Sequence, residues 1–349
     1  MHRYPELSFT VGMPNMVPDQ LSEVELLKIY AEFQWNQLGQ ALDCPSHLLV
    51  SDEGERLYAS VIQVESRFGR DGNIAQYQEG DQVHARGAVQ FYAKHFVEGW
   101  TLFDKKEIPE ATVAGIKTKA DLEALDSTWI CMTNAMVARL ADNSRLKTFS
   151  PLGIKDKRVP TSSEKPLGIV EHERVMQTGK VEPFYGPERL TPICPVDASP
   201  IPYAIQLEND LNGAGLLYFA RYVAMMNYAE RIFLLKRLPR PFSQPLIRFL
   251  STERRRSFFF ANAQETDEVM VYCTGAAVDL DRAPKRPSGL RTEAMRFQFF
   301  FDLHRKSDGV LMGKSVVSKA LSIPNRFSSL LGEARRFAAE LSEGRNQAS

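Results

Sequence analysis

The sequence predicts an α+β fold in which one module, a long helix followed by antiparallel strands, is present twice. In each half a glycine turn precedes a long helical segment and a strand-like run. The turns lie at Gly12 and at 213–215, so the two copies are offset by about 200 residues. A proline-rich stretch separates the two copies. A duplicated module in one chain is typical of a fused dimer, whose copies can diverge. We therefore expect a single active site.

The N-terminal module is predicted at residues 1–150. Ser22 and Glu25 have the spacing of a helix capping box, and apolar residues recur at helical intervals through 21–42. Strand-like runs and turns follow this helix. They predict a hairpin from 47–50 and 56–67, strands at 74–77, within 82–103 and at 129–140, and a short helix at 117–125.

The segment 151–202 is predicted to be a connector, and 203–349 the C-terminal module. Nine prolines lie between 149 and 202, a density that opposes long regular elements. Helical spacing returns through 216–237, and strand-like patterns follow it. The predicted strands are 256–263, 268–272, 294–304 and 310–321, and a terminal helix is predicted at 325–341.

Composition excludes several classes of function. The formal net charge is zero, with 43 residues of each sign, so no global field attracts nucleic acid. The four cysteines show no paired spacing, which argues against a zinc cage or a disulfide scaffold and favours a reducing cytoplasm. No apolar run has the length of a membrane span or the form of a signal peptide. We expect a cytoplasmic protein with no membrane or nucleic-acid partner.

Short motifs then carry a resemblance to a known family. The run DLNGAGLLYFA at 210–220 resembles the helix entry of hot dog thioesterases, in which a curled antiparallel sheet wraps a long helix. Together with VGMP at 11–14, LSE at 21–23 and LYAS at 57–60, it resembles the double hot dog acyltransferase/decarboxylase family of polyketide biosynthesis, of the leinamycin-pathway type.

The resemblance implies both a fold and a reaction. The fold would be a double hot dog. The reaction would take methylmalonyl-coenzyme A, form an acyl ester on a tyrosine, release carbon dioxide and deliver propionyl to an acyl carrier protein. The implied partners are acyl-CoA and the acyl carrier protein of a polyketide synthase. No metal or organic cofactor is implied, since the coenzyme A thioester is itself the substrate.

The tyrosine that resembles the family nucleophile is Tyr58. A phenol with a pKa near 10 needs help to act as a nucleophile, but its ester is reactive toward a thiol. Strand periodicity places Arg56, Tyr58 and Ser60 on one face, where Arg56 could stabilise a phenolate. The matching position of the second half is expected to be Phe260, which lacks the hydroxyl. The alternative is that Tyr58 is an ordinary sheet aromatic.

Decarboxylation leaves an enolate whose oxygen needs fixed hydrogen-bond donors, which a helix N-terminus supplies. We expect Gly213 and Gly215 to bring such a terminus near the thioester, with Asn212 as a further donor and Asp210 as a cap. A tight turn into a packed helix is the alternative. Gly12 and Met13 match this place in the first half, and the sequence leaves the choice between the two ends open.

Other polar residues are weaker candidates. Gln82, His84 and Arg86 share a strand face, so His84 or Arg86 could reach a carboxylate or a phenol, although such faces are often only solvated. Two basic clusters could hold coenzyme A phosphates or an acidic carrier, or could be ordinary solvated surface. They comprise Lys236, Arg237 and Arg240 after the second long helix, and Arg254, Arg255 and Arg256 before the following strand.

Two other functions stay open at this stage. A hot dog thioesterase or dehydratase would act on a carrier-bound acyl chain, and a dehydratase would pair a histidine with a carboxylate; His84 is the strand-face histidine that fits best, but no acidic partner is evident. A non-catalytic acyl-thioester binding protein would never become acylated. Covalent labelling by an acyl-CoA therefore separates these hypotheses.

Overall fold

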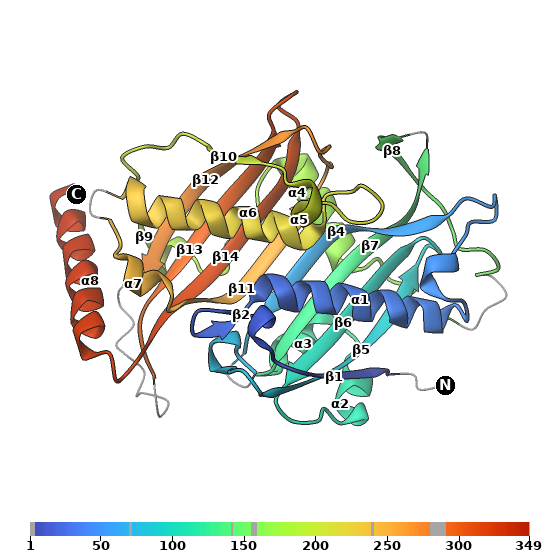
Figure 1. Ribbon diagram of the computed structural model, residues 1–349, viewed down its shortest axis with the longest axis horizontal. Helices are drawn as coiled ribbons and strands as arrows, with labels where there is room; N and C mark the ends of the chain where they lie inside the picture. Colours follow the sequence, from blue (N-terminus) through green and yellow to red (C-terminus); the bar gives the residue numbers. More distant parts are fainter. Residues whose placement is uncertain are drawn as a thin grey trace.

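One antiparallel sheet runs through the whole molecule, and two long helices lie along the same face of it (Figure 1). The computed structural model describes residues 4–348 except 70–71, 141, 155–158, 239–240 and 280–290. Twelve strands form the sheet, in the order β1-β5-β6-β7-β4-β11-β14-β13-β12-β10, with β8 beside β7 and β9 beside β12. The architecture is α+β, as predicted, with one long helix for each half of the sheet.

The N-terminal half contributes helix α1 (Glu23–Ala41), and the serine cap expected from the sequence is present. The Ser22 hydroxyl accepts a hydrogen bond from the Glu25 amide at 3.3 Å, which satisfies one of the free N–H groups of the first turn. The strands are β1 (Glu6–Thr10), β2 (Met16–Val17), β3 (Gln20–Leu21), β4 (Leu57–Arg67), β5 (Gln82–Tyr92), β6 (Phe96–Asp104), β7 (Thr128–Leu140) and β8 (Asp142–Thr148). Strands β2 and β3 form a separate two-stranded hairpin.

The C-terminal half is built around helix α6 (Phe219–Ile232), which continues as one π turn (Phe233–Arg237). Its strands are β9 (Thr191–Pro192), β10 (Ile201–Ala204), β11 (Leu250–Phe259), β12 (Glu268–Asp279), β13 (Arg291–Arg305) and β14 (Leu311–Pro324). Its other helices are α5 (Leu207–Asp210), α7 (Gln244–Ile247) and the terminal α8 (Ser328–Ala348).

Strands β4 and β11 pair at the centre of the sheet and join the two modules. Arg256 lies opposite Glu65 in this antiparallel ladder. Above it, one apolar core packs both long helices onto the sheet, and it includes Val64 of β4 and Phe259 of β11. We call this side of the sheet the helix face. The continuous ladder and the shared core make the two modules one packed unit.

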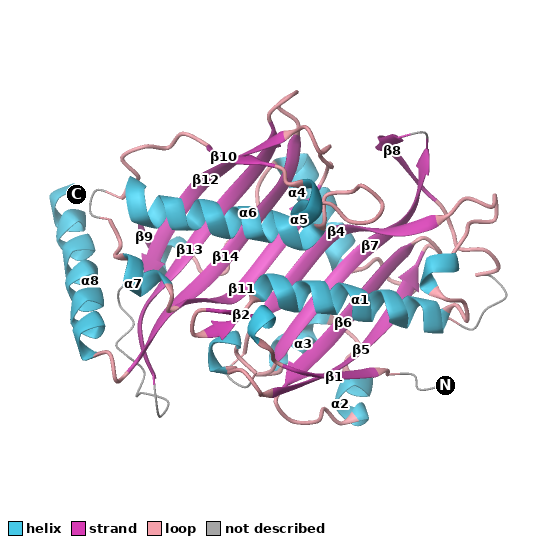
Figure 2. Cartoon of the chain, viewed as in Figure 1, coloured by secondary structure: helices cyan, strands magenta, loops and turns pink. Residues whose placement is uncertain are grey.

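Three shorter helices lie on the opposite face of the sheet, as Figure 2 shows: α2 (Glu110–Gly115), α3 (Lys119–Ala124) and α4 (Leu167–Thr178). Helix α4 approaches β4 and β7 closely at Gly168, where a Cβ would lie 2.1 Å from the Thr133 hydroxyl oxygen. A glycine is therefore required at this contact. Side chains of the central strands that point away from α1 and α6 meet these helices.

Several predicted elements differ from the structure, among them the strand predicted at 256–263, which begins earlier as β11 (Leu250–Phe259). Residues 47–50 form no hairpin strand; Pro45 precedes a 3-10 turn (Ser46–Leu48), and a single bridge joins Val50 to Arg56. The predicted strand at 74–77 is a 3-10 turn (Ile74–Gln76), because the Asn73 side chain caps it. The proline-rich connector contains helix α4, since its prolines flank that helix rather than interrupt it; Pro166 begins it and Gly179 ends it.

Candidate functional site

A groove of about 1450 Å³ lies along the boundary between the two modules. Its walls come from the segment after β4, from β11, from β13 and β14, and from the segment around Tyr185. Six arginines and six carboxylates line it, so that anion binding would need a local excess of arginines. The arginines are Arg67, Arg189, Arg254, Arg291, Arg296 and Arg326, and the carboxylates are Asp19, Glu79, Glu123, Asp126, Glu253 and Glu293.

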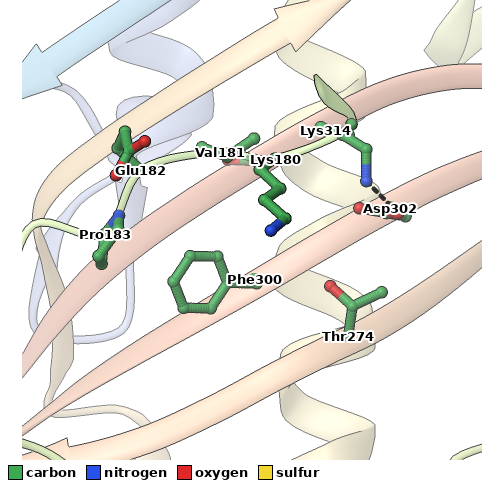
Figure 3. Close-up of a pocket in the computed structure, with 10 residues that line it drawn as sticks. Lys180, Val181, Glu182, Pro183, Thr274, Phe300, Asp302 and Lys314 are labelled. Carbon is green, nitrogen blue, oxygen red and sulfur yellow. Dashed lines mark hydrogen bonds and ion pairs between the residues drawn. The ribbon is translucent and has the colours of Figure 1, made fainter. Parts of the chain in front are cut away.

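A smaller pocket of about 350 Å³ lies over strands β12, β13 and β14 (Figure 3). Lys180 extends over these strands from the segment after α4, near Phe300, and Lys314 pairs with Asp302. The residues that line this pocket include none of the candidates drawn from the sequence. The loop that leads into α6 does contain several of these candidates, Asp210, Asn212, Gly213 and Gly215.

That loop lies before the helix rather than at its N-terminus, which corrects the expected position of Gly213 and Gly215. Helix α6 begins at Phe219 with Tyr218 as its N-cap, and a bridge between Leu211 and Leu217 closes the loop. The Gly215 amide donates to the carbonyl oxygen of Asn212 at 2.8 Å. The two glycines therefore shape a hairpin-like loop and do not supply the free amides of the first helical turn.

Asn212 and Asp210 hold this loop together. The Asn212 side-chain oxygen accepts from the amides of Ala214 and Leu216, at 2.9 and 3.1 Å. Asp210 is fully buried and accepts from the Gln206 amide at 2.8 Å and from the Arg221 guanidinium at 2.7 Å. A buried carboxylate needs such partners, so Asp210 anchors the loop to α6 through Arg221.

The Asp210–Arg221 pair includes a third group, Tyr203 of β10. Its hydroxyl lies 3.2 Å from an Asp210 oxygen and 3.2 Å from an Arg221 guanidinium nitrogen. Burial, together with the Asp210 charge, raises the pKa of Tyr203 above its usual value, even though Arg221 acts against the rise. The phenol is therefore protonated at neutral pH and donates to the carboxylate.

The structure brings Tyr58 and Ser60 together with each other but not with the helix-entry loop. Their neighbours along β4, Ala59 and Val61, pack against the cores beneath the long helices. Alternation along the strand therefore directs Tyr58 and Ser60 to the opposite face, because the bulge of β4 begins only after Val61. Tyr58 is half-buried, and the guanidinium of the exposed Arg56 lies 5.2 Å from its ring centroid.

The expected match between Tyr58 and Phe260 is wrong. Tyr58 is the second residue of β4, whereas Phe260 follows the last residue of β11 (Leu250–Phe259). The second residue of β11 is Ser251. The apolar run Leu57-Tyr58-Ala59 at the start of β4 resembles the end of β11 rather than its beginning. Matching the two halves by their apolar runs therefore pairs positions that differ in their place along the strand. A missing hydroxyl at Phe260 therefore says nothing about where acyl transfer would occur.

The remaining candidates of the first half are dispersed. The Gly12 amide donates to the Asn15 side chain at 2.9 Å, and Met13 begins a 3-10 turn with its side chain exposed. His84 and Arg86 share a face of β5, as predicted. Nδ1 of His84 lies 2.9 Å from the Ser8 hydroxyl oxygen, and Arg86 pairs with Glu6. Strands β6 and β7 separate β5 from β4, so these side chains are not beside Tyr58.

The second basic cluster is neither a solvated surface nor an open phosphate site, the two alternatives that the sequence left open. Arg254, Arg255 and Arg256 all form ion pairs inside the sheet junction, and Arg255 is only 1% exposed. Arg237 pairs with Asp197, while Lys236 is exposed and Arg240 lies outside the described residues. Arg254 and Arg255 are therefore unavailable as a phosphate or carrier site, because their charges are already neutralised.

Sequence reasoning missed a buried ionic network beneath the two long helices. Arg255 donates to Glu23 of α1 at 2.7 Å and to the Asn227 side chain of α6 at 2.8 Å. Lys319 of β14 binds the same Asn227 oxygen at 3.0 Å and pairs with Glu230 at 2.9 Å. The one signal was Asn227, a polar residue that falls on the apolar stripe of the predicted helix. This network ties α1, α6, β11 and β14 together.

One ion pair of this network has a neutral counterpart in the first module. Gln34 of α1 and Glu230 of α6 occupy the same place relative to the N-caps Ser22 and Tyr218. Gln34 accepts from the Asn134 amide at 2.9 Å, so that a neutral pair in the first module corresponds to the charged Lys319–Glu230 pair in the second. Although burial raises the pKa of Glu23, Arg255, Lys319 and Thr252 together hold it below its usual value.

A second ionic cluster, centred on Glu65 of β4, lies on the opposite face. This buried carboxylate binds Lys119 at 2.5 Å, Arg254 at 2.6 Å and Arg256 at 2.8 Å. Burial opposes ionisation, but Lys119, Arg256 and Arg254 outweigh it and lower the pKa of Glu65 to about 2. The ring of Phe184 covers the guanidiniums of Arg254 and Arg256 at 4.6 and 5.3 Å.

The two loop glycines allow a matched test. A Cβ at Gly213 would meet no atom within 4 Å, whereas Gly215 has a φ of +69°, which strains a β-branched residue. We expect Gly213→Val to keep the wild-type thermal midpoint of unfolding. Gly215→Val should lower the free energy of unfolding by roughly 1–2 kcal/mol. Slower thioester turnover by folded Gly213→Val would place the substrate against this loop, because the new side chain obstructs the loop surface. Unchanged turnover in folded Gly213→Val would place the substrate elsewhere.

Comparison with solved structures identifies the fold. An acyl-ACP thioesterase from Bacteroides thetaiotaomicron is similar over 91% of this chain and 98% of its own, with a TM-score of 0.51 and 11% identity. The 12:0-ACP thioesterase from Umbellularia californica matches over 93% and 99%, with a TM-score of 0.51 and 10% identity. An oleoyl thioesterase from Lactobacillus plantarum matches over 91% and 96%, with a TM-score of 0.53 and 8% identity.

Sequence comparisons add no narrower assignment. No family model matches the sequence. No curated protein matches it either. Among the described residues, no helix is long and apolar enough to span a membrane. At these identities the structural matches concern the fold alone. Their coverage, together with the twelve-stranded sheet and its two long helices, identifies the fold of this chain as a double hot dog.

Proposed function

We propose that the protein acts on acyl thioesters carried by coenzyme A or by an acyl carrier protein. The observation that supports this most is the double hot dog fold, which this chain shares over more than nine-tenths of its length with proteins described as an acyl-ACP thioesterase and a 12:0-ACP thioesterase. The inference from fold to substrate class is an analogy.

The finer proposal is an acyltransferase/decarboxylase that uses Tyr58 and methylmalonyl-coenzyme A. The phenolate oxygen of Tyr58 attacks the thioester carbonyl, the C–S bond breaks, and coenzyme A leaves as a thiol after taking up a proton. The bond to the free carboxylate breaks, carbon dioxide leaves, and the enolate takes up a proton. The thiol of the polyketide synthase carrier then attacks the ester and restores the phenol. Half-burial of Tyr58 and its contact with Arg56 support this role.

Hydrolysis is the second candidate, and one observation favours it. Tyr58 and Asn212 belong to opposite sides of the sheet, so the helix-entry loop could bind a thioester without any tyrosine ester. In that case water would attack the carbonyl and release the free acid. A dehydratase is less well supported, because His84 binds Ser8 on β1, away from the module boundary.

Intact-protein mass after incubation with methylmalonyl-coenzyme A tests the proposal. We expect one acyl adduct, release of free coenzyme A, and complete loss of the adduct in Tyr58→Phe. Tyr92→Phe is the matched control, since Tyr92 is another half-buried strand tyrosine. Persistence of the adduct in Tyr58→Phe would contradict the nucleophile. Thiol release without an adduct would support hydrolysis, and binding without thiol release would support a non-catalytic role.

A further inference from the structure

One end of the boundary groove carries more arginines than carboxylates. Asp19, at the tip of the β2–β3 hairpin, accepts from Arg248 through Nε at 2.7 Å and lies 2.5 Å from its Nη2. Arg291 donates to the backbone carbonyls of Asp19 and Ser322, at 3.1 and 3.3 Å, and so is fixed without using the Asp19 carboxylate. Arg326 is exposed beside them and lines the groove with Arg291.

The positive charges of Arg291 and Arg326 repel each other. Burial and the nearby Arg326 lower the pKa of Arg291, while Asp19 acts in the other direction. Among the described residues Arg326 has no ion-pair partner, and the Asp19 carboxylate is committed to Arg248. Three guanidinium groups thus share one carboxylate, and the local charge is positive although the groove as a whole is balanced.

An aromatic pair orients two of these arginines. Phe249 and Phe327 lie with ring centroids 5.4 Å apart. The guanidinium of Arg248 lies 5.7 Å from the Phe249 centroid, and that of Arg326 lies 5.0 Å from the Phe327 centroid. Such contacts restrict the planar groups. Arg248 already uses Nε and Nη2 on Asp19, so among the described residues it is Arg326 that keeps its N–H donors for an anion. Of the remaining groove arginines, Arg67, Arg254 and Arg296 already contact carboxylates, and Arg189 lies over the Tyr185 ring.

We propose that Arg291 and Arg326, beside the Asp19-bound Arg248, bind the phosphate of a phosphopantetheine-bearing thioester, with the rest of the molecule lying along the groove. The inference rests on the proposed action on thioesters. Planar guanidiniums bind phosphate oxygens through paired hydrogen bonds, and the groove is wide enough for an extended ligand. Coenzyme A and a loaded carrier share this phosphate, so the site recognises the chemistry that the two have in common.

Direct binding of coenzyme A by calorimetry tests the site independently of turnover. We expect Arg326→Ala to weaken coenzyme A binding by roughly tenfold or more, as loss of a charge-assisted hydrogen bond does, and to leave the weak binding of pantetheine, which has no phosphate, unchanged. Arg326 is exposed, so the fold should tolerate the change. Arg335→Ala, an exposed arginine of α8 that does not line the groove, is the matched control.

Competition separates the two sources of phosphate. Displacement by 4′-phosphopantetheine would assign the site to the phosphate that coenzyme A and the carrier share, and displacement only by adenosine 3′,5′-bisphosphate would contradict the proposal. Equal coenzyme A affinity in wild-type and Arg326→Ala protein, or an equal loss for pantetheine, would overturn the site. Arg326-dependent binding without thioester turnover would retain the site and contradict the proposed function.

Discussion

Arg255→Glu should leave little folded protein at neutral pH. Arg255 is 1% exposed and donates to Glu23 at 2.7 Å, so the reversal would place two carboxylates together in the core. Removing one partner of a buried ion pair costs about 3–5 kcal/mol, and reversing its charge costs more. Urea unfolding followed by circular dichroism measures the loss. Arg231→Glu, on the exposed side of α6, should change the free energy of unfolding by less than about 1 kcal/mol.

A double variant tests whether the uncompensated charge causes this loss of stability. Glu23→Leu combined with Arg255→Met removes both charges and keeps the volume apolar, an exchange that is often neutral in protein cores. We expect this variant to regain most of the stability that Arg255→Glu loses. Folded, stable Arg255→Glu would instead mean that water or a rearranged Lys319 compensates for the missing guanidinium. Either way, reversing Arg255 would not report on carrier docking.

Glu65→Gln should lower the free energy of unfolding by about 3 kcal/mol at pH 7, because Lys119, Arg254 and Arg256 would lose their common carboxylate. The free energy of unfolding of this variant should also fall less steeply in acid than that of the wild-type protein. The pKa of Glu65 falls from 4.5 to about 2 on folding, so its contribution is complete above about pH 4.5 and disappears as the pH falls toward 2.

Urea unfolding at several pH values between 7 and 2.5 measures both effects. The wild-type protein should lose stability more steeply below pH 4.5 than Glu65→Gln does. Glu182→Gln provides the control, since its carboxylate is largely exposed and pairs only with Arg174 on the surface. Parallel pH profiles for wild-type and Glu65→Gln would show that other carboxylates dominate acid unfolding.

Local patterns predicted the elements well where a single physical signal dominates. The Ser22 cap and the apolar spacing gave helix α1 within two residues at each end, and alternation located β5, β6, β7 and β13. The terminal helix was also expected. Helix α4 was missed because its flanking prolines were counted as interruptions, although proline at a helix start is favourable.

The sheet face that a side chain occupies and its ion-pair partners were harder to predict than the helices and strands. Period-two spacing correctly grouped Tyr58 with Ser60, but which side of the sheet they occupy depends on where the helices pack. The arginines at 254–256 look like surface charge in the sequence; their carboxylates, Glu23 and Glu65, lie far away along the chain and meet them only through the β4–β11 ladder. A single sequence carries no signal for such a long-range pairing.

The Glu65 cluster also determines which strands can recognise each other. Glu65 lies on β4, whereas Arg254 and Arg256 lie on β11 and face it across the antiparallel ladder. If β11 paired with a second β11 in place of β4, Arg254 and Arg256 would lose the Glu65 carboxylate, and buried cations without a counter-charge are destabilising. The two halves of the chain are therefore complementary at this strand pair, and neither half can take the place of the other there.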